Sequence, residues 1–266
     1  MLRKETSPSD PRTFIALKAT ARTRAVILAD TVDSLSAEVP FSVTSGALSV
    51  TDPCYQDDSW CSGVLSEVRN GTWLAQVGYY RDSHDVVSME NHLAQTQASA
   101  QAGRYLKDEA AAAEYAAMFN ESIERAASAL LNYSGRIAFL RIRHSEASHI
   151  SDPAQATVLD FVVGVDSGQA GFFDRAAFVE VCNPDSQSVF ESFYDRVGEL
   201  TMGKGEFGAL EWGVSCHSGY GDGGYEARVA RDAQGQAIAA VIIFIDNSEA
   251  DESEEESEAS KAPLLQ

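Results

Sequence analysis

Short runs of apolar and β-branched residues, bounded by Gly, Asp, Asn or Pro, recur through most of the chain and predict β-strands. The run 237–245 is apolar at nearly every position, so we expect a central strand that is covered on both faces. The turn-forming residues 231–236 precede it and predict a hairpin with the strand before them. The predicted strands cover residues 41–51, 72–80, 136–143, 157–165, 213–216, 225–230 and 237–245.

Helical periodicity is clearest over residues 108–132, where good helix formers carry apolar residues at steps of three and four and Asp108 is a suitable N-cap. The Gln- and Ala-rich stretch 88–104 is either a second helix or a loose excursion, and a shorter helix is predicted over 186–199. Together these elements predict an α+β fold. Its main part is an antiparallel sheet, arranged as a sandwich or a barrel, with a helical insertion at 88–132.

Composition divides the chain into three parts. Residues 1–40 form an N-terminal extension with two short predicted strands, 13–17 and 25–29, and residues 41–246 form the main domain. The segment 247–266 is rich in acidic residues and poor in apolar ones, so we expect a disordered acidic tail.

The balance of charge is strongly acidic, with a formal net charge of −20 at pH 7. Such a protein repels phosphate backbones and anionic lipids, whereas a metal ion or a basic partner is favoured. The chain has no apolar run long enough to cross a membrane and no secretory signal, so we expect a soluble, cytoplasmic protein. Its four cysteines lack a Cys-x-x-Cys pair, which favours free thiols over a zinc site.

The loop 215–225 is the most unusual segment, because four glycines surround potentially reactive side chains. It lacks the Gly-Lys-Ser/Thr ending of a phosphate-binding loop. Cys216 and His217 are neighbours on an extended segment and point to opposite faces, so they do not form a nucleophile–base pair. Tyr220 is flanked by glycines and is a candidate to stack on a ligand.

Two segments of the β region resemble each other. Residues 43–52 and 165–174 each contain Ser-Gly, and each has Asp six residues after that Gly. Because Ser-Gly pairs are common, either chance or an internal repeat explains the similarity. A repeat would place the Ser-Gly turns, with Ser218-Gly219 as a third, at equivalent corners of the sheet.

Three aspartates follow predicted strands and are candidate site residues. Asp52, Asp166 and Asp222 either terminate their own turns or converge on one site, where their carboxylates would act as catalytic groups and would bind Mg²⁺ or Mn²⁺. The candidate ligand-binding residues beside them are Ser167, Gln169, Ser218, Tyr220, Gly221 and Gly223.

The segments 44–46, 52–55, 165–171 and 218–225, followed by the closing apolar strand, resemble the bacterial and phage family called domain of unknown function 4241. The combination of Asp-Ser-Gly-Gln-Ala with Ser-Gly-x-Gly-Asp-Gly-x-Tyr is the most specific part of this resemblance, which covers residues 41–246. The helical insertion is long for such a protein and the acidic tail is an addition. The resemblance implies a shared fold and a shared polar rim that unites the three aspartates, but it supplies no reaction.

These observations support a leading hypothesis and two alternatives. In the first, the strand-end loops form an acidic, glycine-lined pocket that binds a small, nucleotide-like ligand or hydrolyses it with the help of a metal; whether the protein is an enzyme stays open. In the second, the protein is an acidic interaction protein, such as a phage or bacterial inhibitor or immunity-type factor, that binds a basic protein partner. In the third, the glycines only make turns.

Overall fold

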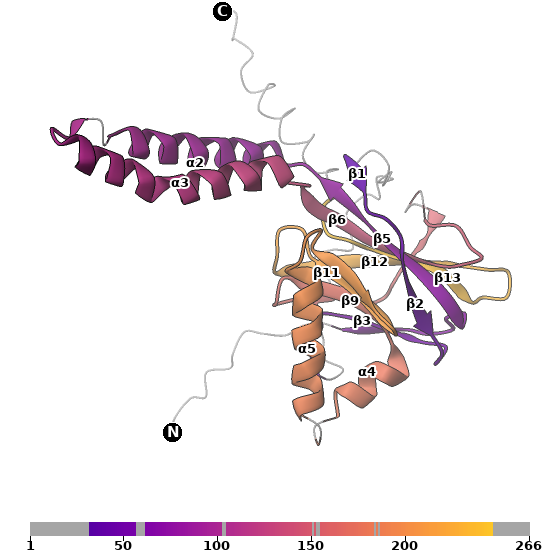
Figure 1. Cartoon of the computed structure of the whole chain (residues 1–266). Coiled ribbons are helices and arrows are strands. Elements are labelled where there is room, and N and C mark those ends of the chain that lie inside the picture. The colour runs from indigo at the N-terminus through magenta and orange to yellow at the C-terminus, as the bar shows by residue number, and fades with distance from the viewer. Residues whose placement is uncertain are drawn as a thin grey trace, which may run out of the picture.

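The computed structural model describes residues 32–56, 62–102, 105–150, 152, 155–183, 185 and 187–246 (Figure 1). The strands expected before residue 32 and the tail expected after Asp246 lie outside these residues. The described residues form two antiparallel sheets and four helices, which confirms the α+β prediction. The described strands do not close into a barrel.

The larger sheet has eight strands in the order β1-β5-β6-β13-β12-β7, with β2 also paired to β5 and β8 to β12. Its strands are β1 (Ser34–Leu35), β2 (Val39–Val43), β5 (Gly71–Tyr80), β6 (Arg136–His144), β7 (Thr157–Val158), β8 (Val163–Val165), β12 (Gly223–Arg231) and β13 (Ala237–Ile243). As predicted, β13 is central and pairs with both β6 and β12. Its side chains from Ala239 to Ile242 are almost completely buried, which fits its apolar sequence.

The smaller sheet has five strands in the order β10-β11-β9-β3-β4. They are β3 (Leu48–Thr51), β4 (Gly63–Leu65), β9 (Gln169–Asp174), β10 (Phe207–Leu210) and β11 (Gly213–His217). Successive side chains of β9 alternate between two layers, as strand geometry requires. Phe172 belongs to the main core with the larger sheet, and Phe173 packs with Phe178 and Phe193 beneath the helices α4 (Arg175–Val181) and α5 (Gln187–Thr201).

Two predicted strands are each divided in the structure. The run 41–51 is not one strand, because a turn at Gly46, with φ of +71°, separates β2 from β3. The run 157–165 is likewise interrupted between β7 and β8. In the first case a Ser-Gly pair inside a β-rich run signals the break, since Gly adopts positive φ without strain.

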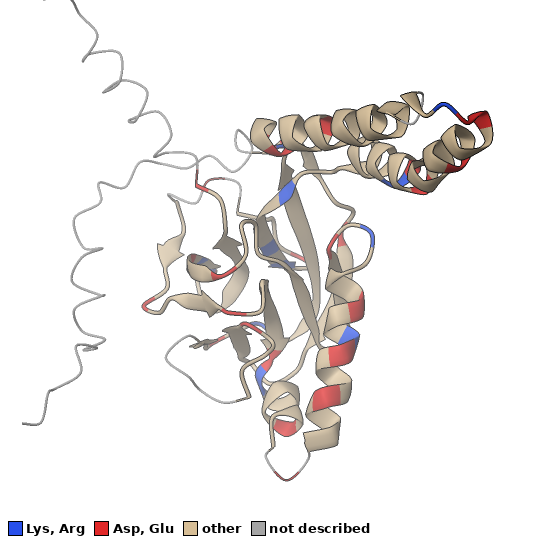
Figure 2. Ribbon diagram, turned by 90° about the vertical axis from the view of Figure 1, so that its left-hand side faces the viewer, with Lys and Arg blue, Asp and Glu red and all other residues tan. Residues whose placement is uncertain are grey.

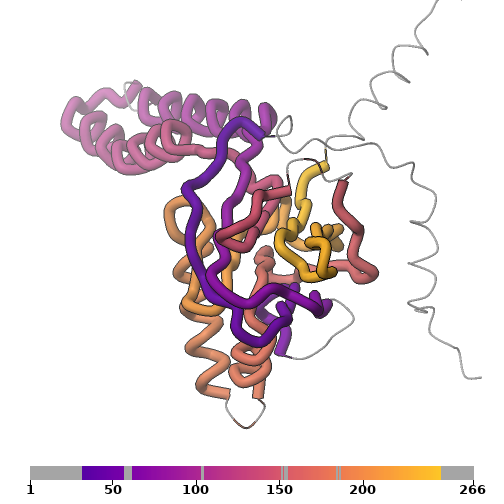
Figure 3. The backbone as a smooth tube through the Cα atoms, turned by 90° about the vertical axis from the view of Figure 1, so that its right-hand side faces the viewer, coloured from indigo at the N-terminus to yellow at the C-terminus, as the bar shows by residue number. Residues whose placement is uncertain are grey.

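The helices α2 (Ser83–Ala102) and α3 (Glu109–Asn132) form an antiparallel pair that we call the arm (Figures 1 and 3). The carboxylate of Asp108 accepts hydrogen bonds from the N–H groups of Ala110 and Ala111, which confirms it as the N-cap of α3. The stretch 88–104 is helical up to Ala102, which settles the choice left open by the sequence. The arm leaves the larger sheet between β5 and β6 and extends away from both sheets (Figure 1).

Candidate functional site

Asp52 lies at the end of β3 and is completely buried, with 0% of its surface exposed. One carboxylate oxygen, Oδ2, accepts hydrogen bonds from the N–H groups of Asp166 and Ser167, both at 2.8 Å. The other, Oδ1, accepts from the Ser167 hydroxyl at 2.6 Å and from the Cys54 N–H at 2.8 Å. With hydrogen bonds on both oxygens, this carboxylate fastens the turn at Ser167-Gly168, which we call the second Ser-Gly turn, to β3.

This geometry gives Asp52, which the sequence predicts as a catalytic or metal-binding residue, a structural role in the corner. A general base needs to reach substrate, and a metal ligand needs a free lone pair that faces the ion. The Asp52 carboxylate is closed off from solvent and engaged on both oxygens. The hydroxyl of Ser167, a predicted ligand-binding residue, donates its hydrogen bond to the same carboxylate.

Asp166 and Asp222 both lie at the second Ser-Gly turn and are exposed. Asp166 accepts a hydrogen bond from the Tyr55 hydroxyl at 2.6 Å, and Asp222 accepts one from the Gly168 N–H at 3.1 Å. The structure thus brings both residues to the corner that Asp52 supports. Within the described residues, however, no group of three or more His, Cys, Asp or Glu side chains is arranged to hold a metal ion, so the expected three-carboxylate site for Mg²⁺ or Mn²⁺ is not formed.

Gln169 follows the turn and is buried, with 9% of its surface exposed. Its side-chain oxygen, Oε1, has no hydrogen-bond donor. Gln169 lies opposite His217 in the register of β9 and β11, so the two side chains share one face of the smaller sheet. This buried acceptor is the one feature of the corner that the protein leaves unsatisfied among the described residues.

The glycine-rich loop closes on itself. The Ser218 hydroxyl donates to the carbonyl of Gly221 at 2.9 Å, and the Tyr225 hydroxyl donates to that carbonyl at 2.6 Å and to the Ser218 carbonyl at 3.1 Å. Gly221, with φ of +101°, makes this turn possible because other residues rarely adopt that conformation. Ser218 and Gly221 are thus occupied within the loop, and Gly223 starts β12 opposite Val165.

Tyr220 projects from this loop to the root of the arm, which we define as the residues Asp82, Asp85, Tyr133 and Arg136 where the chain enters and leaves the helix pair. Its hydroxyl donates to Asp82 at 2.7 Å, and the Arg136 guanidinium lies over its ring at 4.6 Å from the centroid. Burial and then the Asp82 hydrogen bond raise the pKa of Tyr220 to about 12. Although 57% exposed, Tyr220 therefore contacts the arm, and a guanidinium covers one face of its ring.

Arg136 is the centre of this arm root. Its guanidinium binds the Asp85 carboxylate with two hydrogen bonds, both at 2.7 Å, and also lies 3.4 Å from the Gly219 carbonyl. The Tyr133 hydroxyl donates to the same Asp85 carboxylate. The hydrogen bonds from Arg136 hold the pKa of Asp85 below its usual value despite partial burial. The start of α2 and the end of α3 thus meet at Asp85, and both Arg136 and Tyr220 link the arm to the glycine-rich loop.

Beyond its root the arm consists of two helices that pack only on each other. For this reason none of the side chains in Ser83–Ala102 or Glu109–Asn132 is buried. The side chains between the helices recur at steps of three and four, as in a helix bundle, but are only half-buried. On α2 these seam residues are Val86, Met89, Leu93, Thr96 and Ala100, and on α3 they are Ala112, Ala116, Phe119, Ile123, Ala126 and Leu130.

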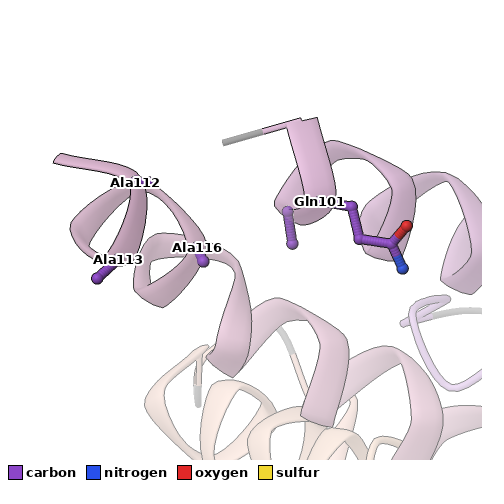
Figure 4. Close-up of a pocket in the computed structure, with 5 residues that line it drawn as sticks. Gln101, Ala112, Ala113 and Ala116 are labelled. Atoms are coloured by element: carbon purple, nitrogen blue, oxygen red, sulfur yellow. The ribbon is translucent and has the colours of Figure 1, made fainter. Parts of the chain in front are cut away.

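Small residues, Ala100, Ala112 and Ala116, lie along the seam near the far end of the arm, where the half-buried Tyr115 also packs on Phe119 at 5.4 Å between ring centroids. There the small residues leave an open groove with a volume of about 430 Å³ between the helices (Figure 4). The groove is lined by Ala100, Gln101, Ala112, Ala113 and Ala116. Alanine side chains are too short to fill the space between two helices, so an additional side chain has room at this groove.

The sequence does not predict the structural roles of two residues. Asp174 is only 2% exposed and accepts hydrogen bonds from the N–H groups of Thr44 and Ser45, and Arg136 binds Asp85. Their partners lie far away in the chain, so local pattern did not reveal them. For Asp174 the signal was available in the spacing it shares with Asp52.

Comparisons with protein-family models, with curated proteins and with solved structures gave no match to the chain. The resemblance to domain of unknown function 4241 therefore gains no support. None of the described helices is both long and apolar enough to span a membrane.

Proposed function

We propose that the protein is an acidic interaction protein that binds a basic partner protein through the arm, and that the partner contributes an amphipathic helix. The observation that carries this proposal is the half-buried seam of the arm, which neither sheet covers. Helices gain most of their stability in proteins by burying an apolar face. A third helix laid along the seam would complete a bundle and bury residues such as Leu93 and Phe119.

Charge supports the basic character of the partner. The two arm helices contain six acidic residues and one basic residue, Arg125, which pairs with Glu121. Acidic positions are marked in red along the arm in Figure 2. Glu90, Glu109, Glu114 and Glu124 are all exposed. A partner helix with lysine or arginine beside its apolar stripe would be attracted to these carboxylates, and a large apolar side chain would enter the alanine-lined groove.

The test is direct binding of a synthetic helical peptide of leucine and lysine, measured by fluorescence anisotropy at several salt concentrations. Ala116 lines the groove, whereas its neighbour Ala117 is exposed and does not, so Ala116→Trp and Ala117→Trp form a matched pair. We expect Ala116→Trp to weaken binding about tenfold or more and Ala117→Trp to change it less than about twofold. Equal affinities of the two variants would argue against the arm as the binding site. Binding that is insensitive to salt would argue against attraction by the carboxylates.

A second candidate function is binding of a small polar ligand at the second Ser-Gly turn, supported by the buried, donor-free Oε1 of Gln169. Asp166 and Asp222 would line the entrance to this site, and no metal ion is required. Thermal shift with adenosine and with AMP tests it. We expect the nucleoside to raise the melting temperature of the wild type but not that of Gln169→Met, which keeps the shape of the side chain and removes the acceptor.

A further inference from the structure

We infer that the chain is built from two equivalent units in tandem, related by an internal two-fold axis, and that the arm is an insertion present in the first unit alone. The first unit runs from β2 to β6 and the second from β8 to β13. The axis passes between the paired strands β6 and β13 of the larger sheet and between β3 and β9 of the smaller one, because each of these pairs joins equivalent strands.

The two Ser-Gly turns provide the first evidence. Gly46 and Gly168 have the same φ of +71°. Just as Asp52 accepts the N–H groups of the second turn, Asp174 accepts those of the first, from Thr44 at 2.7 Å and Ser45 at 2.9 Å. Each aspartate also uses its other oxygen to accept the N–H group two residues further along its own chain, from Cys54 and from Ala176. Each unit therefore fastens the turn of the other.

The N–H groups of the two turn glycines are also satisfied in the same way. Gly46 donates to the side-chain oxygen of Asn70 at 2.8 Å, and Gly168 donates to that of Asp222 at 3.1 Å. Asn70 and Asp222 each precede by one residue the first residue of the following strand, β5 or β12. The carboxylate of Asp222 thus occupies a position that a neutral amide fills in the first unit.

The aromatic residues of β5 and β12 match as well. Trp73 donates from its indole N–H to the Arg69 carbonyl, and Tyr225 donates from its hydroxyl to the Gly221 carbonyl, in each case four residues earlier. Trp73 packs edge-to-face against His144 at 87°, and Tyr225 packs edge-to-face against Phe244 at 88°. These pairs share geometry but not residue type.

The hairpins that carry these aromatic residues match in register. In the first unit the pairing of β5 with β6 shifts between Gly78 and Tyr79, and in the second the pairing of β12 with β13 shifts between Ala230 and Arg231. Directly after the shift, Tyr79 pairs with Ile137 and Arg231 pairs with Ala237. Between these pairs the second unit has only the residues 232–236, whereas the first has the whole arm.

The third Ser-Gly pair does not mark a third copy. Ser218 donates its N–H to the Gly168 carbonyl, so Ser218-Gly219 packs against the second turn and does not occupy an equivalent corner. In the first unit Val68 donates its N–H to the Gly46 carbonyl and fills this role without a Ser-Gly pair. Two units, and not three, account for the observed contacts.

The second unit has its own addition, α4, α5 and β10, but those helices cover the buried Phe173 and belong to the core. The arm differs, because none of the side chains in its two helices is buried. The arm is therefore a separable module, and removing it should leave two intact sheets. The part of this inference that concerns partner binding rests on the proposed function, but the equivalence of the units does not.

One experiment replaces residues 80–136 with the sequence of residues 232–236, so that both hairpins have the same turn. We expect this armless variant to unfold cooperatively, with a melting temperature within about 5 °C of the wild type, and to lose helical circular dichroism. A variant with no cooperative transition would overturn the separability of the arm. If a folded armless variant still binds the leucine–lysine peptide, the proposed function fails while the equivalence of the units stands.

A second measurement tests the equivalence even if the armless variant does not fold. Hydrogen exchange followed by mass spectrometry is applied to Asp52→Asn and Asp174→Asn. We expect a crossed pattern, in which Asp52→Asn speeds exchange at residues 166–167 and Asp174→Asn speeds exchange at 44–45, each by about tenfold or more. If either variant affects only the turn of its own unit, the inference of two equivalent units is wrong.

Discussion

Asp52 and Asp174 hold each other's units: the carboxylate of each accepts two backbone N–H groups from the turn that lies before the other in the chain. Both residues are nearly inaccessible to solvent. Burial of a charged carboxylate is costly unless hydrogen-bond donors surround it. The donors around Asp52 and Asp174 offset this cost, so both carboxylates stabilise the fold.

Removal of the Asp52 carboxylate should therefore reduce stability strongly. We expect Asp52→Ala to lower the free energy of unfolding by about 3 kcal/mol or more, because it leaves several buried N–H groups without an acceptor. Asp222→Asn is the control, since Asn70 already makes the equivalent hydrogen bond with an amide oxygen, and it should cost less than about 0.5 kcal/mol. Urea denaturation measures both values, and a large loss for Asp222→Asn would show that its charge is structural.

Stability should also fall in acid through Asp174. Burial raises the pKa of this carboxyl, but N–H donors such as those of Thr44 and Ser45 outweigh burial and hold the pKa below its usual value of 3.8. A depressed pKa in the folded state means that the stabilisation is complete above pH 3.8 and is lost as pH falls below it. We expect Asp174→Asn to flatten this loss in melting curves recorded between pH 6 and pH 2.5. An unchanged slope would exclude Asp174 as its source.

The arm root should depend on Arg136. We expect Arg136→Lys to speed hydrogen exchange in the first turns of α2 and the last turns of α3, because lysine does not reproduce the two parallel hydrogen bonds to Asp85. Exchange in β13 should stay unchanged. Tyr220→Phe, which removes only the hydrogen bond to Asp82, is the matched control and should have a smaller effect. Uniform acceleration across the sheets would instead indicate a role in global stability.

Cys54 should be unreactive at neutral pH. Burial, followed by the hydrogen bond to Asp52, raises the pKa of its thiol to about 12. At pH 8 its thiolate fraction is then lower than that of a free cysteine by roughly a thousandfold, and labelling by iodoacetamide should slow accordingly. Peptide mass spectrometry locates the label, and guanidinium-unfolded protein provides the fully reactive reference. Rapid labelling of Cys54 in the folded protein would contradict this environment.

The sequence predicted those parts of the fold that depend on local pattern. The central position of β13 follows from an uninterrupted apolar run, and α3 follows from its periodicity and from Asp108. The interruption at Gly46 was missed because apolar residues continue on both sides of it.

The structural role of Asp52 could not be predicted from the sequence for a different reason. A buried carboxylate and a catalytic one look alike in sequence, and the donors that distinguish them lie more than a hundred residues away, at Asp166 and Ser167. The similarity between residues 43–52 and 165–174 contained this information, but only the structure shows that each aspartate acts on the other segment.

The crossed contacts of Asp52 and Asp174 have a consequence for a chain cut between the two units, in the connection that follows β6. Each fragment would contain one Ser-Gly turn and one aspartate, but the aspartate that fastens its turn would belong to the other fragment. Neither fragment would be complete without the other, and the pair would assemble as an obligate heterodimer. Covalent continuity in this protein therefore supplies high local concentration to a complex that its two halves already specify.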